Sequence, residues 1–175
     1  MDDGLQEIQV HTMTIRVAVI GAGGRGRMFR LAHKPHEGVA LAAVCDVSQA
    51  VRDDYAANYP GVAVYDDYQR MLDDGPYDAV AVMSPDFLHE DHGLAALRTG
   101  AAIYLEKPIA ITPQGCERLL ATAAEHGSRL YVGHNMRFFP VIRKMKEIID
   151  SGRIGKVQAV WCRHFIDYGS RWRWP

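Results

Sequence analysis

The first residues that could do chemistry form a glycine-rich run directly after a short apolar segment. The run fits the pattern GxGxxG and consists of Gly21, Ala22, Gly23, Gly24, Arg25 and Gly26. In such a run the first glycine permits a tight turn, the second lets the backbone approach a pyrophosphate, and the third lets a helix pack closely on a strand. The helix that follows would add unpaired N–H groups and a partial positive charge. The run therefore predicts a site for the diphosphate of a dinucleotide.

An acidic residue at the expected distance supports the same interpretation. Asp46 lies 20 positions after Gly26, at the end of a second apolar run. A carboxylate there can accept hydrogen bonds from the ribose hydroxyls of the adenosine half, and it would repel the 2′-phosphate of NADP. The pattern favours NAD, with NADP as the alternative because Arg25 and Arg27 could accommodate a phosphate. The competing interpretation is structural: the glycines form only a turn, and Asp46 or Ser48 only caps a helix.

Three further groups of polar residues each follow an apolar run, where a buried strand would end. They are Ser84, Pro85 and His89 after the fourth run, Glu106 and Lys107 after the fifth, and Asn135 and Arg137 after the sixth. In a parallel sheet covered on both faces, ligands bind outside the carboxyl ends of the strands. We therefore expect these residues and the glycine run to surround one cleft.

The elements that must position these residues alternate regularly between apolar runs and stretches with helical periodicity. The apolar runs predict strands at 15–20, 39–45, 62–64, 78–83, 101–105 and 130–132. Between them, helices are expected at 25–32, around Leu94, and after caps at Ser48, Asp67 and Thr112. Such an alternation predicts an α/β fold with a doubly wound, parallel Rossmann sheet.

The pattern changes after Gly133. A helix is expected at 140–150 and a long strand at 156–165, which has no partner among the ten residues that follow it. Because a lone strand is not a finished domain, the chain is expected to stop inside a second one. The predicted division is a disordered extension at 1–13, a dinucleotide-binding domain at 14–136, and the start of a truncated second α/β domain at 137–175. Unpaired strand edges beside Trp161, Trp172 and Trp174 predict self-association into a homo-oligomer.

Composition argues against several other classes of function. The net charge of −1 and scattered basic residues give no sign of nucleic acid or a membrane surface as partner, and no run approaches the roughly 20 apolar residues of a membrane helix. Three distant cysteines without CxxC spacing predict neither disulfides nor zinc, and the HxxH spacing of His89 and His92 lacks a third ligand, so no metal is expected. Reduced thiols and a polar N-terminus without a signal core indicate the cytoplasm.

Four motifs stand in a fixed order along the chain. They are GAGGRG after the first strand, SPDFLH after the fourth, EKP after the fifth, and VGHNMRF leading to SGRIGKV. This series resembles the Gfo/Idh/MocA oxidoreductases, named for glucose–fructose oxidoreductase and inositol dehydrogenase. The resemblance implies an N-terminal Rossmann domain and a C-terminal α/β domain with an open mixed sheet that forms the substrate pocket and the oligomer contact. It also implies hydride transfer between NAD(P) and a hydroxyl of a sugar or polyol.

The same resemblance assigns a catalytic role to Lys107. As the EKP lysine it would lie near the nicotinamide and the reacting oxygen, where an ammonium can donate a hydrogen bond and stabilise growing charge. Partial burial would tune its proton affinity, and Glu106 would hold its side chain in place. Pro108 ends the strand so that the lysine points into the cleft, and the Lys107–Pro108 bond is expected to be cis. The structural alternative is an ion pair at a strand end with no further role.

The remaining motif residues receive roles on the cofactor by the same resemblance. Ser84, Pro85 and His89 match the TPxxxH stretch that lines the nicotinamide, with serine replacing the commoner threonine. Asn135 and Arg137 match the exit of the sixth strand, where they would contact cofactor or substrate. For His89 a purely capping role is the alternative, and for Asn135 and Arg137 a structural one.

One departure from the family pattern concerns proton transfer. The family completes it with an aspartate and a histidine of a DxxxH-type motif in the second domain, which would lie beyond Pro175. Asp167 and His164 are in the wrong context to replace them. The leading hypothesis is the N-terminal part of an NAD(P)-dependent sugar or polyol dehydrogenase. The alternatives are an NAD-dependent glycoside hydrolase, acting by transient oxidation and elimination, and a nucleotide-binding module without turnover.

Overall fold

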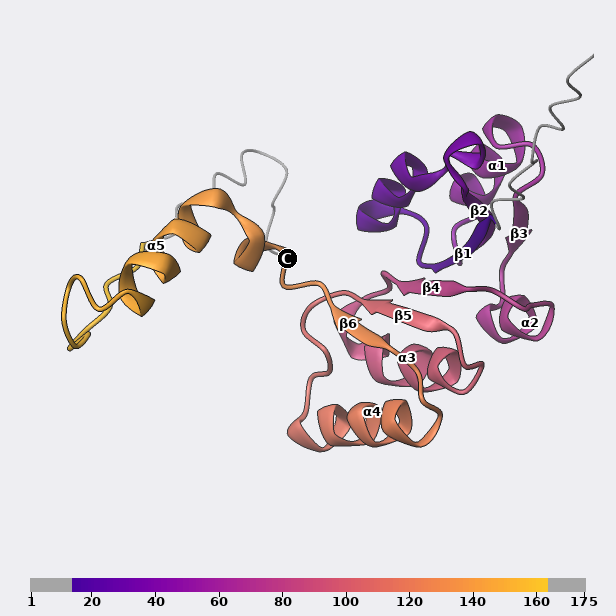
Figure 1. Cartoon of the computed structure of the whole chain (residues 1–175). Helices are drawn as coiled ribbons and strands as arrows, with labels where there is room; N and C mark the ends of the chain where they lie inside the picture. The colour runs from indigo at the N-terminus through magenta and orange to yellow at the C-terminus, as the bar shows by residue number, and fades with distance from the viewer. Residues whose placement is uncertain (1–13, 164–175) are drawn as a thin grey trace, which may run out of the picture. The chain divides into compact units, whose positions relative to one another are not determined.

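The computed structural model describes residues 14–163 and divides the chain into two compact units, Met1–His134 and Asn135–Pro175. In the first unit six parallel strands form one sheet in the order β3-β2-β1-β4-β5-β6 (Figure 1). The predicted doubly wound Rossmann sheet is therefore confirmed. The switch in strand order lies between β1 and β4, so the carboxyl ends of these two strands flank the crevice in which such sheets bind ligands.

The strands agree closely with the apolar runs of the sequence. They are β1 (Ile15–Ile20), β2 (Val39–Cys45), β3 (Ala63–Tyr65), β4 (Ala79–Val82), β5 (Ala102–Leu105) and β6 (Leu130–Val132). Every paired ladder is parallel. Near-continuous apolar sequence suits these strands because helices cover both faces of the central sheet, so alternate side chains of β1, such as Ala18 and Val19, are equally buried.

Two groups of helices cover the two faces of the sheet. On one face Tyr55 and Val51 of α1 (Gln49–Asn58) and Phe29 of η1 (Gly24–Ala32) pack with the core residues of β1 and β2. The other face is covered by α2 (Tyr68–Asp73), α3 (His89–Leu97) and α4 (Pro113–Glu125). Figure 1 shows α3 and α4 side by side along β4, β5 and β6. Short 3₁₀ turns, η2 (Pro35–Glu37) and η3 (Asp86–Leu88), complete the connections.

The starts of the helices test the predicted caps. The Thr112 hydroxyl accepts a hydrogen bond from the Gly115 N–H (3.0 Å) and the Asp67 carboxylate accepts one from the Arg70 N–H (2.9 Å), so both caps are confirmed. Ser48 occupies the N-cap position of α1, but its hydroxyl makes no capping bond. The helix expected after the glycine run is a 3₁₀ helix, consistent with two glycines in its first turn and only Gly26 buried.

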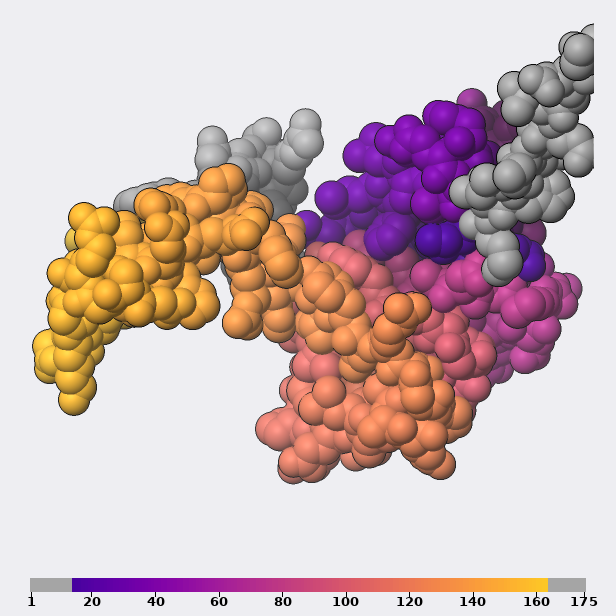
Figure 2. Space-filling view, in the orientation of Figure 1, coloured from indigo at the N-terminus to yellow at the C-terminus, as the bar shows by residue number. Residues whose placement is uncertain are grey.

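The second unit contains η4 (Asn135–Phe138) and α5 (Pro140–Asp150), the latter with the predicted bounds. Figure 2 shows this unit in orange to yellow. Four apolar side chains of α5 are exposed, namely Val141, Ile142, Met145 and Ile149. The predicted strand at 156–165 is wrong for residues 156–163, which form no strand. A strand needs a hydrogen-bonded neighbour, and the described residues supply none here. The predictions for 1–13, His164, Asp167, Trp172 and Trp174 lie outside the described residues.

No helix in the described part of the chain is long and apolar enough to cross a bilayer. Cys45 is buried, Cys116 is half-buried and Cys162 is exposed, and none of the three is in a disulfide. Burial raises the pKa of the Cys45 thiol to about 12, with the charges of Asp67 and Asp46 adding to the shift. Cys45 is therefore a packed, protonated thiol at the end of β2.

Candidate cofactor cleft and lysine turn

Backbone crowding explains why the loop between β1 and η1 is built from glycines. Gly21 has a φ of +84°, and a Cβ there would lie 2.8 Å from the backbone of Met83 and Ser84 at the end of β4. A Cβ on Gly26 would collide with the carbonyl oxygen of Gly21. The loop therefore closes on itself and on β4 only if these two side chains are absent.

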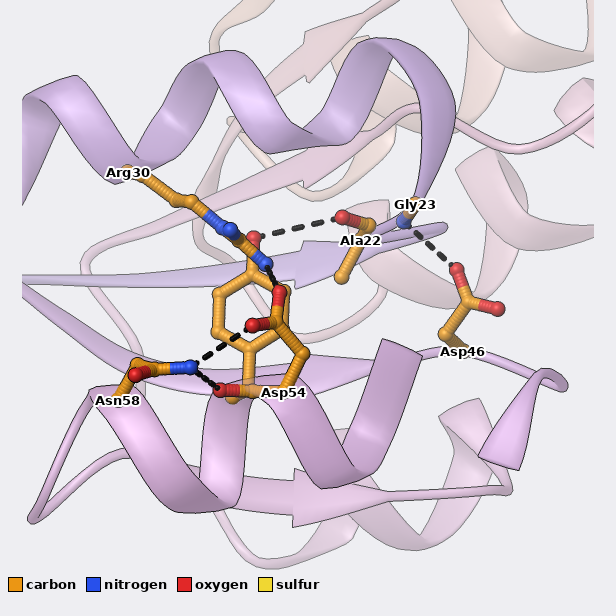
Figure 3. A network of polar contacts seen from close by, with 7 residues as sticks. Ala22, Gly23, Arg30, Asp46, Asp54 and Asn58 are labelled. Carbon is orange, nitrogen blue, oxygen red and sulfur yellow. Dashed lines mark hydrogen bonds and ion pairs between the residues drawn. The ribbon is translucent and has the colours of Figure 1, made fainter. Parts of the chain in front are cut away.

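A polar network between α1, η1 and the glycine loop supports the loop (Figure 3). The Tyr55 hydroxyl donates to the carbonyl oxygen of Ala22 (3.3 Å), and the Arg30 guanidinium lies over the Tyr55 ring, 4.3 Å from its centre. Arg30 also forms an ion pair with Asp54, whose carboxylate accepts a second hydrogen bond from Asn58. The hydrogen bond from Arg30 lowers the pKa of Asp54. Helix α1 thus holds the glycine loop through side chains that do not enter the cleft.

Asp46 connects the end of β2 to the glycine loop. Its Oδ2 accepts a hydrogen bond from the Gly23 N–H (2.8 Å), and its Oδ1 accepts one from the Ser48 N–H (2.9 Å; Figure 3 shows the first). The carboxylate, rather than the Ser48 hydroxyl, therefore organises the start of α1. Each carboxylate oxygen has a second lone pair that could accept from a ribose hydroxyl. The Arg52 guanidinium donates to the Asp46 carbonyl oxygen (2.7 Å).

A cleft of about 810 Å³ opens between the carboxyl ends of β1, β2 and β4. Of the residues expected at the site, its lining includes Gly21, Gly23, Gly24, Arg25, Asp46, Ser84 and Pro85. Ala22 and Gly26 belong to the same loop but are buried and do not line the cleft. Sequence reasoning missed a second set of lining residues, which are Val47, Asp66, Tyr68, Phe87, Leu88 and His92. The signal that could have found most of them was their position just after the ends of β2, β3 and β4.

Ser84 and His92 line the β4 side of the cleft, and His89 is buried behind them. His92 lines the cleft and its Nδ1 lies 2.9 Å from the Ser84 hydroxyl. Burial lowers the pKa of His92, opposed by the charge of Asp91 and reinforced by that of His89. His89 itself is fully buried, and both ring nitrogens face backbone carbonyl oxygens, of Pro108 (2.6 Å) and Ser84 (2.8 Å). Its ring is therefore engaged inside the protein, and a contact with cofactor stays a prediction.

The lysine turn, residues 106–108, follows β5 and contains the EKP motif. Glu106 is buried, and its Oε1 lies 2.9 Å from Nε of Arg25 in the glycine loop. Its Oε2 accepts a hydrogen bond from the backbone N–H of Lys107. Two expectations from the sequence are therefore wrong: Glu106 holds the loop and the turn rather than the lysine ammonium, and Lys107 is exposed rather than partly buried. The Lys107–Pro108 bond is cis, as predicted.

Close packing explains why Glu106 points toward the loop. A Cβ on Gly133 would lie 3.1 Å from Oε2 of Glu106 and 2.6 Å from the Tyr104 hydroxyl. The carboxylate therefore fills the space beside Gly133, with its other oxygen toward Arg25. Burial raises the pKa of Tyr104, and the negative charge of Glu106 adds to the shift.

The last two predicted site residues, Asn135 and Arg137, belong to the second unit and are exposed there. Their roles on cofactor or substrate stay predictions. Within residues 14–163, no group of three His, Cys, Asp or Glu side chains is arranged to hold a metal ion.

Residues 15–134 match the family model described as "Oxidoreductase family, NAD-binding Rossmann fold", of the Gfo/Idh/MocA proteins. The chain belongs to the Gfo/Idh/MocA oxidoreductase family. The chain therefore contains the NAD-binding Rossmann fold of that family. Such folds bind the cofactor in the crevice outside the carboxyl ends of the strands, where the glycine loop and Asp46 line the cleft.

Curated relatives and solved structures include inositol dehydrogenases. The chain is 37% identical over 154 residues to inositol 2-dehydrogenase 2 of Saccharopolyspora erythraea, covering 87% of this chain and 45% of that protein. It is 32% identical over 160 residues to the inositol 2-dehydrogenase of Salmonella typhimurium, covering 87% and 46%. A crystal structure of scyllo-inositol dehydrogenase from Lactobacillus casei with NAD(H) and scyllo-inositol matches with a TM-score of 0.73 and 28% identity, covering 81% and 42%. The chain thus spans less than half the length of these relatives.

Proposed function

We propose that this chain is the cofactor-binding part of an NAD-dependent dehydrogenase that acts on a hydroxyl of a sugar or cyclic polyol. The supporting observation is the 2.9 Å ion pair between Arg25 of the glycine loop and Glu106 of the lysine turn. This pair ties the turn that carries the exposed Lys107 to the glycine loop, which supports a role for the lysine as the acid–base group that alcohol oxidation requires beside a nicotinamide. Relatives named inositol 2-dehydrogenase favour a cyclic polyol within this substrate class.

The residues of the cleft fit NAD. The glycines leave room for a diphosphate against the loop backbone, where N–H groups at the start of η1 can donate to it. The open lone pairs of Asp46 accept from the adenosine ribose, and its charge disfavours a 2′-phosphate. The side chains of Arg52, Arg30 and Arg25 are all engaged by other protein groups, so none of them is held ready for that phosphate.

Lys107 is the residue we assign to the chemical step. Bound NAD supplies the acceptor for a hydride. The Lys107 ammonium donates a hydrogen bond to the substrate oxygen and stabilises the charge that develops there. Its exposure leaves it in contact with water until substrate binds, because Glu106 takes none of its three N–H donors. We assign substrate enclosure and the remaining proton transfer to sequence corresponding to the other half of the relatives.

Calorimetric titration tests the binding half of this proposal. NADH should bind the 175-residue chain, and NADPH should bind more weakly. Absence of NADH binding at millimolar concentration would contradict the proposal. Conversely, NADPH binding at least as tight as NADH binding would remove the role given to Asp46.

Turnover tests the chemical half. With NAD and myo-inositol or common sugars, we expect negligible NADH production by the 175-residue chain, because one lysine can position an oxygen without enclosing it. Full polyol-dependent NADH production by this chain would overturn the assignment of enclosure to further sequence. Cleavage of a glycoside without net NADH would instead identify the glycoside hydrolase, and NADH binding without turnover in any longer form would identify a binding module.

A further inference from the structure

His89 is the most buried ionisable group near the lysine turn, and the proposed reaction leaves it without a role. Its ring is fully buried, between the exit of β4 and the exit of β5. Nδ1 lies 2.6 Å from the Pro108 carbonyl oxygen and Nε2 lies 2.8 Å from the Ser84 carbonyl oxygen. A carbonyl oxygen can only accept a hydrogen bond, so each contact requires an N–H on the ring.

A neutral imidazole has one N–H and one lone pair. With a neutral ring, one of the two contacts would set a nitrogen lone pair against a carbonyl lone pair in a buried place. Only the doubly protonated ring donates to both oxygens. The two observed distances therefore fit an imidazolium that joins residues from two strand ends.

The charged groups around His89 are engaged elsewhere. On α3, Glu90 pairs with Arg118 of α4 (2.6 Å), and His92 faces the Ser84 hydroxyl. On the β5 side Glu106 is held by Arg25 and by the Lys107 N–H. In the part of the chain that the structure describes, no carboxylate hydrogen-bonds to the His89 ring. The two carbonyl oxygens are therefore the groups that would stabilise a charge on the ring.

We propose that His89 is a positioning residue for Lys107, acting in its doubly protonated form as a clamp between Ser84 and Pro108. Pro108 directly follows the lysine, so the clamp fixes the turn against the exit of β4, where Ser84 lines the cofactor cleft. Only the importance of Lys107 rests on the proposed function; the clamp itself does not.

NMR of the ring nitrogens tests the clamp in the unmodified chain. In a long-range ¹H–¹⁵N spectrum at neutral pH, both nitrogens of His89 should have the shifts of N–H nitrogens. His126 is the matched control, because its exposed ring has a single carbonyl contact, from Nδ1 to Thr122 (3.1 Å). It should give the ordinary spectrum of an exposed histidine. A neutral His89 ring with one unprotonated nitrogen at this pH would overturn the proposal.

A variant tests whether the clamp reaches the lysine. In His89→Gln the side chain cannot donate in two opposite directions, so amide hydrogen exchange at Lys107 should speed up about tenfold or more. The Gly23 amide, which donates to Asp46 in the glycine loop, should exchange at the same rate as in the unmodified chain. Unchanged exchange at Lys107 would show that His89 only fills space.

If His89→Gln does not fold, NMR of the unmodified chain decides instead. The ring N–H protons of His89 should show nuclear Overhauser contacts to residues 84 and 108, and their absence would exclude the clamp. NADH titration separates the two proposals: loss of NADH binding in the unmodified chain would refute the proposed function and leave the result for the His89 ring standing.

Discussion

The glycine loop and the lysine turn are built in opposite ways. In the glycine loop, the backbone, Asp46 and the Arg30 network engage one another, so the surface that we assign to the diphosphate is formed by protein contacts alone. At the lysine turn, the buried parts, Glu106 and His89, are equally fixed, yet the Lys107 side chain has no hydrogen bond or ion pair among the described residues. The glycine loop is thus preorganised, whereas the cation that we propose for the chemical step keeps its hydrogen-bond donors available.

The largest effect should come from a methyl group in the glycine loop. Gly26→Ala places a Cβ against the Gly21 carbonyl oxygen, and backbone cannot move aside as a side chain can. NADH affinity should fall by more than about 100-fold, a loss of roughly 3 kcal/mol or more, as measured by calorimetry. Gly61→Ala is the control: it adds strain at a φ of +90° with nothing within 4 Å, and it lies outside the cleft. Equal losses in both variants would mean that general destabilisation, not the loop, is responsible.

Removal of the acidic side chain should have the next largest effect. Asp46→Ala deletes the acceptor for the ribose and releases the Gly23 N–H, so NADH binding should weaken by about 1.5–3 kcal/mol. Discrimination against NADPH should relax at the same time, because the repelling charge is gone. Asp53→Ala, on the exposed side of α1, should change neither affinity. Unchanged binding of both cofactors to Asp46→Ala would exclude this residue from the site.

A substitution in the lysine turn should lower the free energy of unfolding more than it lowers the affinity for NADH. Glu106→Gln weakens a charge-assisted contact with Arg25 and should lower the free energy of unfolding by about 1–2 kcal/mol in urea titrations. NADH affinity should change less than threefold, since Asp46 and the glycines remain in place. Glu37→Gln, in the exposed pair with Lys34, should have almost no effect on stability. A large loss of NADH affinity in Glu106→Gln would show that NADH binding depends on the lysine turn as well as on the glycine loop.

The smallest effect concerns pH and the network behind the glycine loop. Because the hydrogen bond from Arg30 lowers the pKa of Asp54 below its ordinary value of 3.8, the folded state is stabilised above that pH and loses this contribution as pH falls through the lowered value. Asp54→Asn should therefore be slightly less stable than the parent chain at neutral pH, with a difference that shrinks in acid. Thermal unfolding across a pH series would measure it. A constant difference at all pH values would assign the effect to packing.

Local patterns in the sequence predicted most of the fold. Hydrophobic runs located β1, β2 and β6, and the Thr112 and Asp67 caps marked helix starts, because each depends on neighbours within a few residues. The partners of Glu106 and His89 could not be read in this way. Arg25 and Glu106 are about 80 positions apart, and only the parallel order of β1, β4 and β5 brings such residues together. The strand prediction was wrong for the described residues 156–163 for a related reason, since an apolar run becomes a strand only beside another strand.

Asp46 has a consequence for how cofactor preference can change in descendants of this chain. The carboxylate that would exclude a 2′-phosphate is also the group that holds the Gly23 amide and the first turn of α1. A substitution toward a neutral residue would therefore pass through a form with a loosened loop and weak affinity for either dinucleotide. A second change, restoring an acceptor for the Gly23 N–H, would have to come first or at once. Two changes at once are rarer than one, so the proposed preference for NAD should persist longer than properties that a single substitution can alter.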